Sequence, residues 1–161
     1  MDQRLRACIL LVSSDGRPTE TQEKTLKTLE TGPLSEHIEW STSKYISLEA
    51  AVVKKEIRLA CDQQNHQMVL TLGGIGWDVR DRVAESTMEL LDHELPGLVE
   101  LIRLTALQKS KLAALYRGRA GMRNSTLVLN LGSGEAAVIE ALTAIKPLLP
   151  YIFEDRPNPW I

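Results

Sequence analysis

The sequence predicts a three-layer α/β/α sandwich with a mostly parallel central sheet. Apolar runs alternate with amphipathic segments along the chain, the pattern of successive strand–helix units. The runs Leu5–Val12 and His66–Leu72 have the apolar character of strands that are buried on both faces. No repeat, linker or low-complexity tract interrupts this order, so residues 1–161 are expected to form a single domain.

The first predicted strand and helix lie before Gly32–Pro33. Leu5–Val12 is continuous and apolar and ends in the loop sequence SSDGRP. Thr19 and Gln22 have the spacing of a capping box, in which two side chains satisfy backbone groups at a helix start. Gly32–Pro33 ends this helix, which is expected at about residues 19–31.

The next segments are a partly exposed strand and an amphipathic helix. His37–Ser43 alternates apolar and polar side chains, which favours a strand near a sheet edge. From Ser47 to about Gln64, apolar residues recur at helical spacing while basic residues fall on other faces, which predicts a helix. The strand His66–Leu72 follows and runs directly into the glycine-rich sequence GGIG.

The second half of the chain repeats the alternation. Val83–Asp92 and Pro96–Gln108 are predicted helices, and Pro96 suits a first helical turn. Asn124–Leu131 is rich in β-branched and apolar residues, which predicts a strand. A second glycine loop, Gly132–Gly134, follows this strand.

The chain closes with a helix and an irregular tail. Apolar residues at helical spacing from Val138 to Leu149 predict one face of a final helix. Residues 154–161 form a proline-rich tail. The tail either packs across a neighbouring subunit or hangs free, and we expect packing, because Pro157 and Pro159 stiffen it and an exposed Trp160 would be costly.

Composition argues against several functional classes. Hydrophobic residues make up 43% and charged residues 25% of the chain, as in ordinary globular proteins. A formal net charge of -2 argues against broad binding of nucleic acid. The apolar runs are shorter than the about 20 residues that cross a bilayer, and MDQRLR does not resemble a signal peptide. We therefore expect a cytoplasmic protein with neither nucleic-acid nor membrane partners.

The cysteines and histidines lack the spacing of a zinc site, and they do not suggest a catalytic triad. Cys8 falls in a predicted strand and Cys61 in a predicted helix, and both are expected to be buried apolar groups. His37, His66 and His93 are scattered and are expected at the surface or at loop edges.

The two glycine loops are the candidate binding elements. A turn that merely reverses the chain needs few glycines, whereas Gly73, Gly74 and Gly76 let backbone N–H groups approach an anion closely. In parallel sheets, ligands bind beyond the carboxyl ends of the strands, where both loops are predicted. Neither loop matches a dinucleotide or P-loop fingerprint. The alternative is therefore a pair of tight strand-to-helix turns without a ligand.

Two carboxylates follow the first loop. Asp78 and Asp81 could coordinate a divalent cation beside a bound phosphate, and Mg²⁺ suits that role. Each could instead cap a helix start or interact with its dipole. The residue types alone leave both alternatives open.

Three blocks resemble the molybdopterin-binding proteins of molybdenum cofactor biosynthesis. VLTLGGIGWDVRDRVAEST is similar to a family strand that ends in Gly-Gly-Thr-Gly and is followed by an acidic residue. PGLVELIR resembles the family's Pro-Gly-Phe-Gly-Glu-x-x-Arg segment. LYRGRAGMRNSTLVLNLGSGEAAVIEAL resembles its Ser-Arg-x-x-Ala-Gly block, the next strand and a Leu-Pro-Gly-Ser-Pro loop. The blocks occur in the family's order between His66 and Lys146.

The resemblance implies an α/β/α fold that assembles as a homotrimer, or as a hexamer in the branch called molybdenum cofactor biosynthesis protein B. In the other branch, molybdopterin adenylyltransferase, AMP from MgATP is attached to the terminal phosphate of molybdopterin. The implied ligands are molybdopterin and ATP, and the implied metal is Mg²⁺. Other proteins of molybdenum cofactor biosynthesis are implied as partners.

The same resemblance assigns roles to individual residues. Asp81 matches the essential acidic position and is the expected catalytic residue and Mg²⁺ ligand. Arg119 and Arg123 are nearby cations that could meet phosphates, but we expect them to be solvated or subunit-facing. Trp77 could stack on a planar ring beside the loop, but we expect it to pack on its own chain. The residues expected to bind molybdopterin or its phosphate are Gly73, Gly74, Ile75, Gly76, Asp78, Arg117, Gly132, Ser133 and Gly134.

The sequence departs from the family pattern where the chemistry is expected. Ile75 replaces a threonine hydroxyl, Tyr116 replaces a serine, and Glu135 stands in place of a proline. Leu48 lies where the adenylyltransferase branch has a second acidic residue. Losing one positioned donor typically costs about 10² to 10³ in rate. Two alternatives therefore remain: a non-catalytic pterin-binding or scaffolding protein of this fold, and an unrelated phosphate-handling α/β enzyme.

Overall fold

A computed structural model describes residues 3–154 and 156–161. Within these residues it contains a six-stranded sheet with the order β2-β1-β3-β6-β5-β4. The first four of these strands are parallel to one another, and β5 and β4 are antiparallel to their neighbours. The predicted mostly parallel sheet is confirmed. The strands are β1 (Leu5–Ser13), β2 (Ile38–Ser47), β3 (Met68–Leu72), β4 (His93–Glu94), β5 (Ala120–Arg123) and β6 (Thr126–Leu131).

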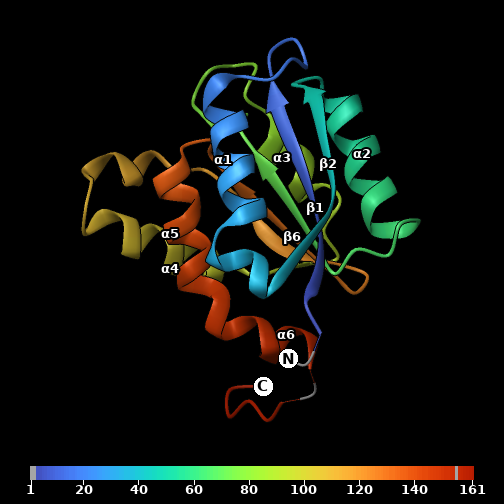
Figure 1. The fold of residues 1–161 in the computed structure, drawn as a ribbon, viewed down its shortest axis with the longest axis vertical. Coiled ribbons are helices and arrows are strands. Elements are labelled where there is room, and N and C mark those ends of the chain that lie inside the picture. Colours follow the sequence, from blue (N-terminus) through green and yellow to red (C-terminus); the bar gives the residue numbers. More distant parts are fainter. Residues whose placement is uncertain (1–2, 155) are drawn as a thin grey trace.

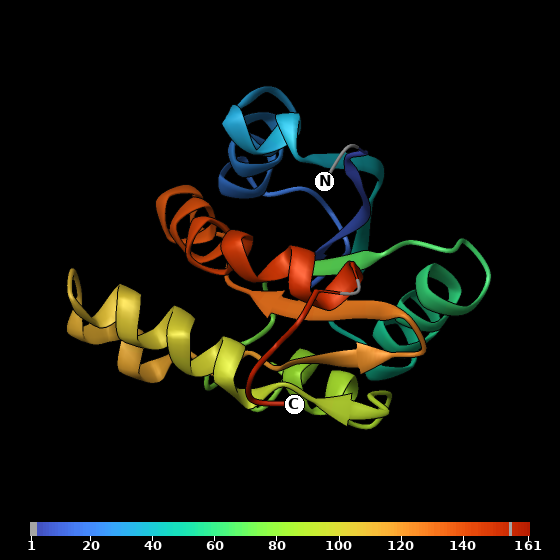
Figure 2. The ribbon, with the colours of Figure 1, turned by 90° about the horizontal axis from the view of Figure 1, so that it is seen from below.

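Helices cover both faces of the sheet. On one face lie α1 (Glu20–Thr31), α4 (Pro96–Leu107) and α5 (Glu135–Ile145), and on the other lie α2 (Ala50–Asp62) and α3 (Val83–Met88). Figures 1 and 2 show α1 and α2 on opposite sides of the strands. The α/β/α sandwich predicted from the sequence is therefore confirmed. The shorter helices are the 3-10 helices Pro33–Glu36, Lys111–Leu115 and Lys146–Leu148, and α6 (Leu149–Phe153).

The core is divided in two by the sheet. Successive side chains of a strand point to opposite faces, so β1 contributes Ile9 and Leu11 to the cluster beneath α1 and α5. It contributes Cys8 and Leu10 to the cluster beneath α2 and α3. Cys8 and Cys61 are both buried and free, as the sequence predicts.

The first helix begins as predicted, whereas the second begins later. Thr19 Oγ1 accepts a hydrogen bond from Gln22 N at 3.2 Å, and Thr19 N donates to Gln22 Oε1 at 3.3 Å, which completes the capping box. Helix α2 starts at Ala50 rather than Ser47, because β2 continues to Ser47 in register with Ser13 of β1.

An antiparallel extension of the sheet was not predicted. Helix α3 ends at Met88 instead of reaching Asp92, and the following residues form β4, which pairs with β5. Strand β5 turns back into β6 through Asn124, whose φ of 51° lies in the left-handed region that asparagine tolerates. Asparagine between two short apolar segments is the sequence signal for this hairpin.

The predicted final helix is interrupted. Helix α5 ends at Ile145, and a 3-10 helix containing Pro147 separates it from α6, since proline lacks the N–H that a continuing helix needs. By length and composition alone, the run Glu135–Phe153 could cross a membrane. In the fold its apolar stripe instead contributes Val138 and Leu142 to the core beside the sheet.

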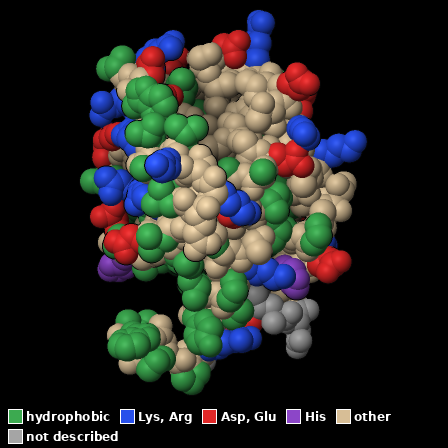
Figure 3. Space-filling model, turned by 90° about the vertical axis from the view of Figure 1, so that its left-hand side faces the viewer, with side chains coloured by type: hydrophobic (Ala, Val, Ile, Leu, Met, Phe, Trp, Pro, Cys, Tyr) green, Lys and Arg blue, Asp and Glu red, His purple; other side chains and the backbone are tan. Residues whose placement is uncertain are grey.

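The C-terminal tail is irregular in its described residues, as expected. Figure 3 shows it as a lobe of mostly hydrophobic side chains below the body of the molecule. Trp160 is 90% exposed in the single chain, so its expected packing across a neighbouring subunit stays a prediction.

His66 is an exception to the predicted exposure of the histidines. His37 and His93 are exposed, but His66, in the loop just before β3, is 2% exposed. Its Nδ1 lies 3.2 Å from the carbonyl oxygen of Ala60, which requires Nδ1 to be the donor. Its Nε2 has no hydrogen-bond partner among the described residues. Burial lowers the pKa of His66 and so favours the neutral form of the ring.

The His66→Gln substitution should flatten the dependence of stability on acid pH. Below the ordinary histidine pKa of 6.5, the unfolded chain binds a proton that the folded chain excludes, so the free energy of unfolding falls as pH decreases. Urea unfolding at pH 7 and pH 5 measures this difference. The exposed His37→Gln variant is the control and should retain the wild-type slope; a wild-type slope in His66→Gln contradicts the assignment.

Candidate functional site

The two glycine loops lie side by side. The first follows β3 and the second follows β6, and these strands are parallel neighbours with Leu72 in register with Leu131. Gly73 N donates a hydrogen bond to Leu131 O at 2.9 Å. A side chain at Gly73 would begin 3.2 Å from Ser133 Oγ. The fold thus brings together two segments that are far apart in the sequence.

Backbone geometry explains two of the glycines without a ligand. Gly73 has φ 108° and Gly74 has φ 70°, both in the region that favours glycine. A side chain at Gly74 would run into Val83 and Leu48. A tight turn alone therefore explains why these two positions are glycine. Gly76 is different, because its φ does not lie in the region that favours glycine.

Gly76 makes room for a carboxylate. A Cβ atom at this position would lie 2.6 Å from Asp81 Oδ2, so the carboxylate of Asp81 covers the Cα of Gly76. Asp81 is partly buried, and its N–H donates to Asp78 O at 2.9 Å. The absence of a side chain at Gly76 thus sets the place of the predicted catalytic carboxylate.

Asp78 is exposed and is engaged within its own turn. Its Oδ1 accepts from Arg80 N at 2.9 Å and from Arg80 Nε at 3.0 Å. The side-chain hydrogen bond from Arg80, followed by the backbone hydrogen bond, lowers the pKa of Asp78. Asp78 therefore has a structural role in the loop tip, whether or not it also meets a ligand.

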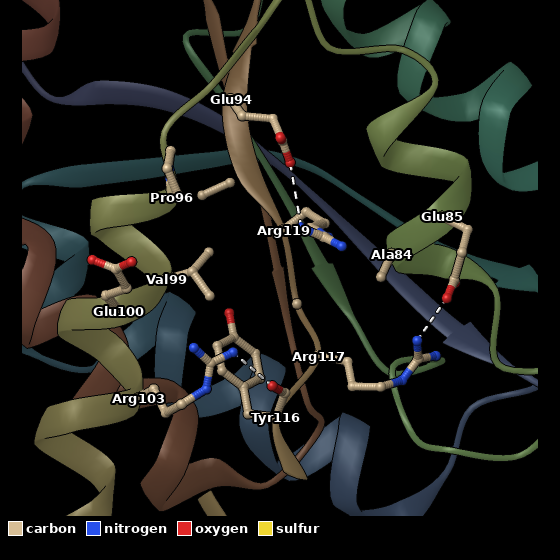
Figure 4. Close-up of a pocket in the computed structure, with 12 residues that line it drawn as sticks. Ala84, Glu85, Glu94, Pro96, Val99, Glu100, Arg103, Tyr116, Arg117 and Arg119 are labelled. Atoms are coloured by element: carbon tan, nitrogen blue, oxygen red, sulfur yellow. Dashed lines mark hydrogen bonds and ion pairs between the residues drawn. The ribbon is translucent and has the colours of Figure 1, made fainter. Parts of the chain in front are cut away.

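Arg117 contacts the first loop through its guanidinium group. Its Nε donates to Gly76 O at 2.8 Å, and Nη2 donates to Asp81 O at 2.8 Å. Its Nη1 donates to Glu85 Oε1 at 2.6 Å, as Figure 4 shows. Burial opposes the ionisation of Glu85, but the hydrogen bond and charge of Arg117 hold its pKa below the ordinary value.

The other arginines of this region occupy different places. Arg119 pairs with Glu94 at 3.5 Å, and both side chains are substantially exposed. Arg123 binds both carboxylate oxygens of Asp62, at 3.0 and 2.6 Å, next to the β5–β6 turn. That turn lies at the opposite end of β6 from the second glycine loop, so Arg123 does not belong to the site.

Tyr116, which replaces the family's serine, supports the wall of the site. Its hydroxyl donates to Asn130 O at 2.7 Å, and its carbonyl oxygen accepts from Arg103 Nη2 at 2.9 Å. The guanidinium of Arg103 also lies 5.6 Å from the centre of the tyrosine ring. Burial raises the pKa of Tyr116. The hydroxyl is therefore committed to the protein backbone.

A cavity of about 540 Å³ is lined mainly by α4, the 3-10 helix Lys111–Leu115 and α5, and residues of both glycine loops also line it. Ligand pockets commonly have about 300 to 1,000 Å³. Arg103 and Tyr116 also line a second, polar cavity of about 380 Å³, shown in Figure 4. Trp77 is 76% exposed, so the expectation that it packs on its own chain is wrong. The cavity is lined in part by Ile75, Gly76 and Trp77 of the first loop, Gly132 of the second, and Val138 of α5.

A polar stripe on α1 holds both loops, and sequence reasoning missed it. Gln22 Nε2 donates to Val12 O at 2.9 Å and to Leu72 O at 3.2 Å, at the ends of β1 and β3. One turn later, Thr25 Oγ1 donates to Ser133 O at 2.7 Å. The available signal was the helical spacing that places Gln22 and Thr25 on the same buried face of α1 as Leu29.

Two further residues of α1 bind Glu135, which stands where the family has a proline. Thr28 Oγ1 donates to Glu135 Oε1 at 3.0 Å, and Lys24 Nζ lies 3.2 Å from Oε2. The hydrogen bonds from Lys24 and then Thr28 lower the pKa of Glu135. A carboxylate in the first turn of α5 is also favoured by the helix dipole. The altered loop is therefore anchored by specific contacts.

The described residues contain no cluster of three metal-binding side chains. Asp81 could supply one carboxylate to Mg²⁺, and Mg²⁺ is often held by one or two carboxylates together with substrate phosphates. The residues therefore fit Mg²⁺ that arrives with a nucleotide better than a metal held by the protein alone.

Comparisons with known proteins identify the relatives of this chain. The model of the family described as "Probable molybdopterin binding domain" matches residues 8–151. The molybdenum cofactor synthesis protein cinnamon of Drosophila melanogaster is 38% identical over 103 residues, which cover 64% of this chain and 17% of that protein. A molybdopterin adenylyltransferase of Helicobacter pylori J99 is 34% identical over 119 residues, 74% of this chain and 65% of that protein. The chain thus spans less than two thirds of each of these relatives.

One solved structure matches this chain over nearly the whole length of both proteins. The molybdopterin biosynthesis enzyme MoaB from Thermus thermophilus has a TM-score of 0.79 and 37% identity, and the match covers 95% of this chain and 98% of that one. The matched family residues include most of β1, both glycine loops and Asp81. The chain therefore belongs to the molybdopterin-binding domain family of molybdenum cofactor biosynthesis.

Proposed function

We propose that this chain binds molybdopterin between its two glycine loops and adenylylates its terminal phosphate with MgATP, in the cytoplasm. The observation that carries the proposal is one cavity lined by residues of both loops, together with the Asp81 carboxylate next to Gly76 of that lining. Family membership supplies the ligand class, and relatives named molybdopterin adenylyltransferase supply the reaction.

Backbone groups of the second loop suit a phosphate. Helix α5 starts at Glu135, and no described side chain caps its N-terminus at Gly134. Unpaired N–H groups and the positive end of a helix dipole favour an anion at such a position. The apolar lining contributed by Val138 and Leu131 suits the flat ring system of a pterin.

The proposed reaction needs positioning more than a protein nucleophile. A terminal phosphate oxygen of molybdopterin forms a bond to the α-phosphorus of ATP, and the bond from that phosphorus to the pyrophosphate oxygen breaks. The two phosphates must be held in line, and the charge on the leaving pyrophosphate must be neutralised. Mg²⁺ supplies charge neutralisation when it enters with ATP, and Asp81 would orient it through one carboxylate.

A non-catalytic pterin-binding or scaffolding role is the alternative, and two residues favour it. Ile75 is 8% exposed and belongs to the core cluster beneath α2 and α3, so it anchors the loop instead of offering a hydroxyl. Leu48 packs against Gly74 of the first loop. The adenylyltransferase branch has an acidic residue where this chain has Leu48.

The Asp81→Asn substitution should separate catalysis from folding. We expect the rate of AMP transfer to molybdopterin to fall by about 10² to 10³, because the side chain keeps its shape but loses the charge that orients the metal. Asp92→Asn, near the β5–β6 turn at the far end of the sheet, is the control. The measurement is AMP transfer from MgATP, with calorimetry of molybdopterin binding and a melting temperature for each variant.

The wild-type result decides between the candidate functions. Molybdopterin binding without AMP transfer selects the non-catalytic alternative. Absence of binding to both molybdopterin and MgATP rejects both. An Asp81→Asn variant that transfers AMP at the wild-type rate removes Asp81 from the proposed mechanism.

We also propose that the chain assembles as a homotrimer or hexamer and contacts other proteins of molybdenum cofactor biosynthesis. The end of α4 and the 3-10 helix Lys111–Leu115 stand out from the body in Figures 1 and 2. Leu104 and Leu112 on this projection are 63% and 74% exposed, which is costly in a monomer. Figure 3 shows the face that bears this projection.

Light scattering measures this assembly directly. We expect a mass of three or six chains that persists on dilution, because contacts between exposed apolar side chains would bury them. Leu112→Glu places a charge on the projection and should reduce the mass, whereas Thr143→Glu, on exposed α5 surface, is the control. A wild-type mass of one chain at every concentration contradicts the proposal.

A further inference from the structure

The tip of the first glycine loop has few contacts of its own. Trp77 and Val79 are 76% and 84% exposed, and the contacts of Asp78 with Arg80 and Asp81 stay inside the loop. Segments with exposed side chains and internal hydrogen bonds open locally at little cost. The position of the carboxylate at the end of this loop therefore needs support from elsewhere in the fold.

Arg117 supplies that support across the base of the loop. Its Nε and Nη2 groups, which lie on one edge of the guanidinium, bind the carbonyl oxygens of Gly76 and Asp81, both at 2.8 Å. These carbonyls are the two ends of the exposed tip, so one rigid group fixes the distance between them. The same two residues are in contact through the carboxylate of Asp81 over the Cα of Gly76.

Glu85 holds the guanidinium in place from the opposite edge. Its Oε1 accepts from Arg117 Nη1 at 2.6 Å, and it lies on α3, which packs against the sheet. Figure 4 shows the Arg117 side chain directed at Glu85 rather than toward Arg103 or Tyr116, which line the wall shared with the larger cavity. Three N–H groups of Arg117 are thus bonded to protein oxygens.

This arrangement requires an arginine. The guanidinium presents donors in a fixed planar fork, whereas a lysine ammonium is a compact charge that cannot occupy both positions of the fork at once. A group that served merely as a positive charge beside phosphate would tolerate lysine. A group that bridges two carbonyls would not.

We propose that Arg117 is a positioning residue that clamps the first glycine loop and thereby sets Asp81 relative to Gly76, without itself carrying the phosphate. The inference rests on the proposed adenylyl transfer for its catalytic consequence. The clamp itself can be observed in the free protein. It changes the role that the family resemblance suggested for Arg117, from a phosphate ligand to a support of the loop.

The Arg117→Lys substitution tests the clamp through kinetics. We expect kcat for AMP transfer to fall on the order of 10²-fold, because a misplacement of about 1 Å has that effect, while KM for MgATP stays close to the wild-type value. Arg119→Lys is the matched control, since Arg119 lies two residues away and pairs with Glu94 instead of the loop. Wild-type kcat in Arg117→Lys, or a raised KM with unchanged kcat, overturns the proposal.

Amide hydrogen exchange tests the same clamp without any ligand. Residues 76–81 should exchange faster in Arg117→Lys than in the wild type or in Arg119→Lys. If the wild type transfers no AMP, the proposed function fails, and the exchange rates alone then test the clamp.

The Glu85→Gln variant, which keeps an acceptor but removes its charge, should show the same change in exchange to a smaller extent. It replaces Arg117→Lys as the test if Arg117→Lys does not fold. Unchanged loop exchange in the folded variant overturns the clamp.

Discussion

The parallel pairing of β3 with β6 is the constraint on which the candidate site depends. The two strands end at the same level of the sheet, with Leu72 in register with Leu131, so the loops that follow them must meet. The hydrogen bond from Gly73 N to Leu131 O joins the first loop to the end of the second strand. Residues of both loops line one cavity because the two loops leave the same edge of the sheet together.

Supports from outside the loops then fix their shapes. Helix α1 contributes Gln22 to the strand ends and Thr25 to the second loop, and Arg117 bridges the first loop. These side chains bond to backbone carbonyl oxygens, which are present whatever side chains the loops carry. A loop residue can therefore differ from the family pattern while the loop stays in place. At Glu135 the replacing side chain itself makes new contacts with Thr28 and Lys24.

The apolar replacements have a different physical effect. Ile75 and Leu48 exchange polar chemistry for packing, since Ile75 is buried and Leu48 lies against Gly74. Burying such side chains stabilises the loop by the hydrophobic effect, roughly 1.5–3 kcal/mol for full burial of a branched side chain. The loop thus becomes more firmly attached to the core as it loses a hydroxyl, which is why binding and catalysis must be considered separately for this protein.

The sequence by itself determined the layers, the parallel strands, both glycine loops and the family. These features rest on local signals: apolar runs, helical spacing, the capping box at Thr19 and ordered motifs. It could not place the β4–β5 extension, because a two-residue strand such as β4 has too little pattern to be recognised. Nor could it show that His66 is buried, that Trp77 is exposed, or that Arg117 bonds to Gly76 and Asp81. Those facts were decided by tertiary structure. They depend on which residues from distant parts of the sequence lie around one side chain, and on the backbone oxygens and cavities that those residues provide.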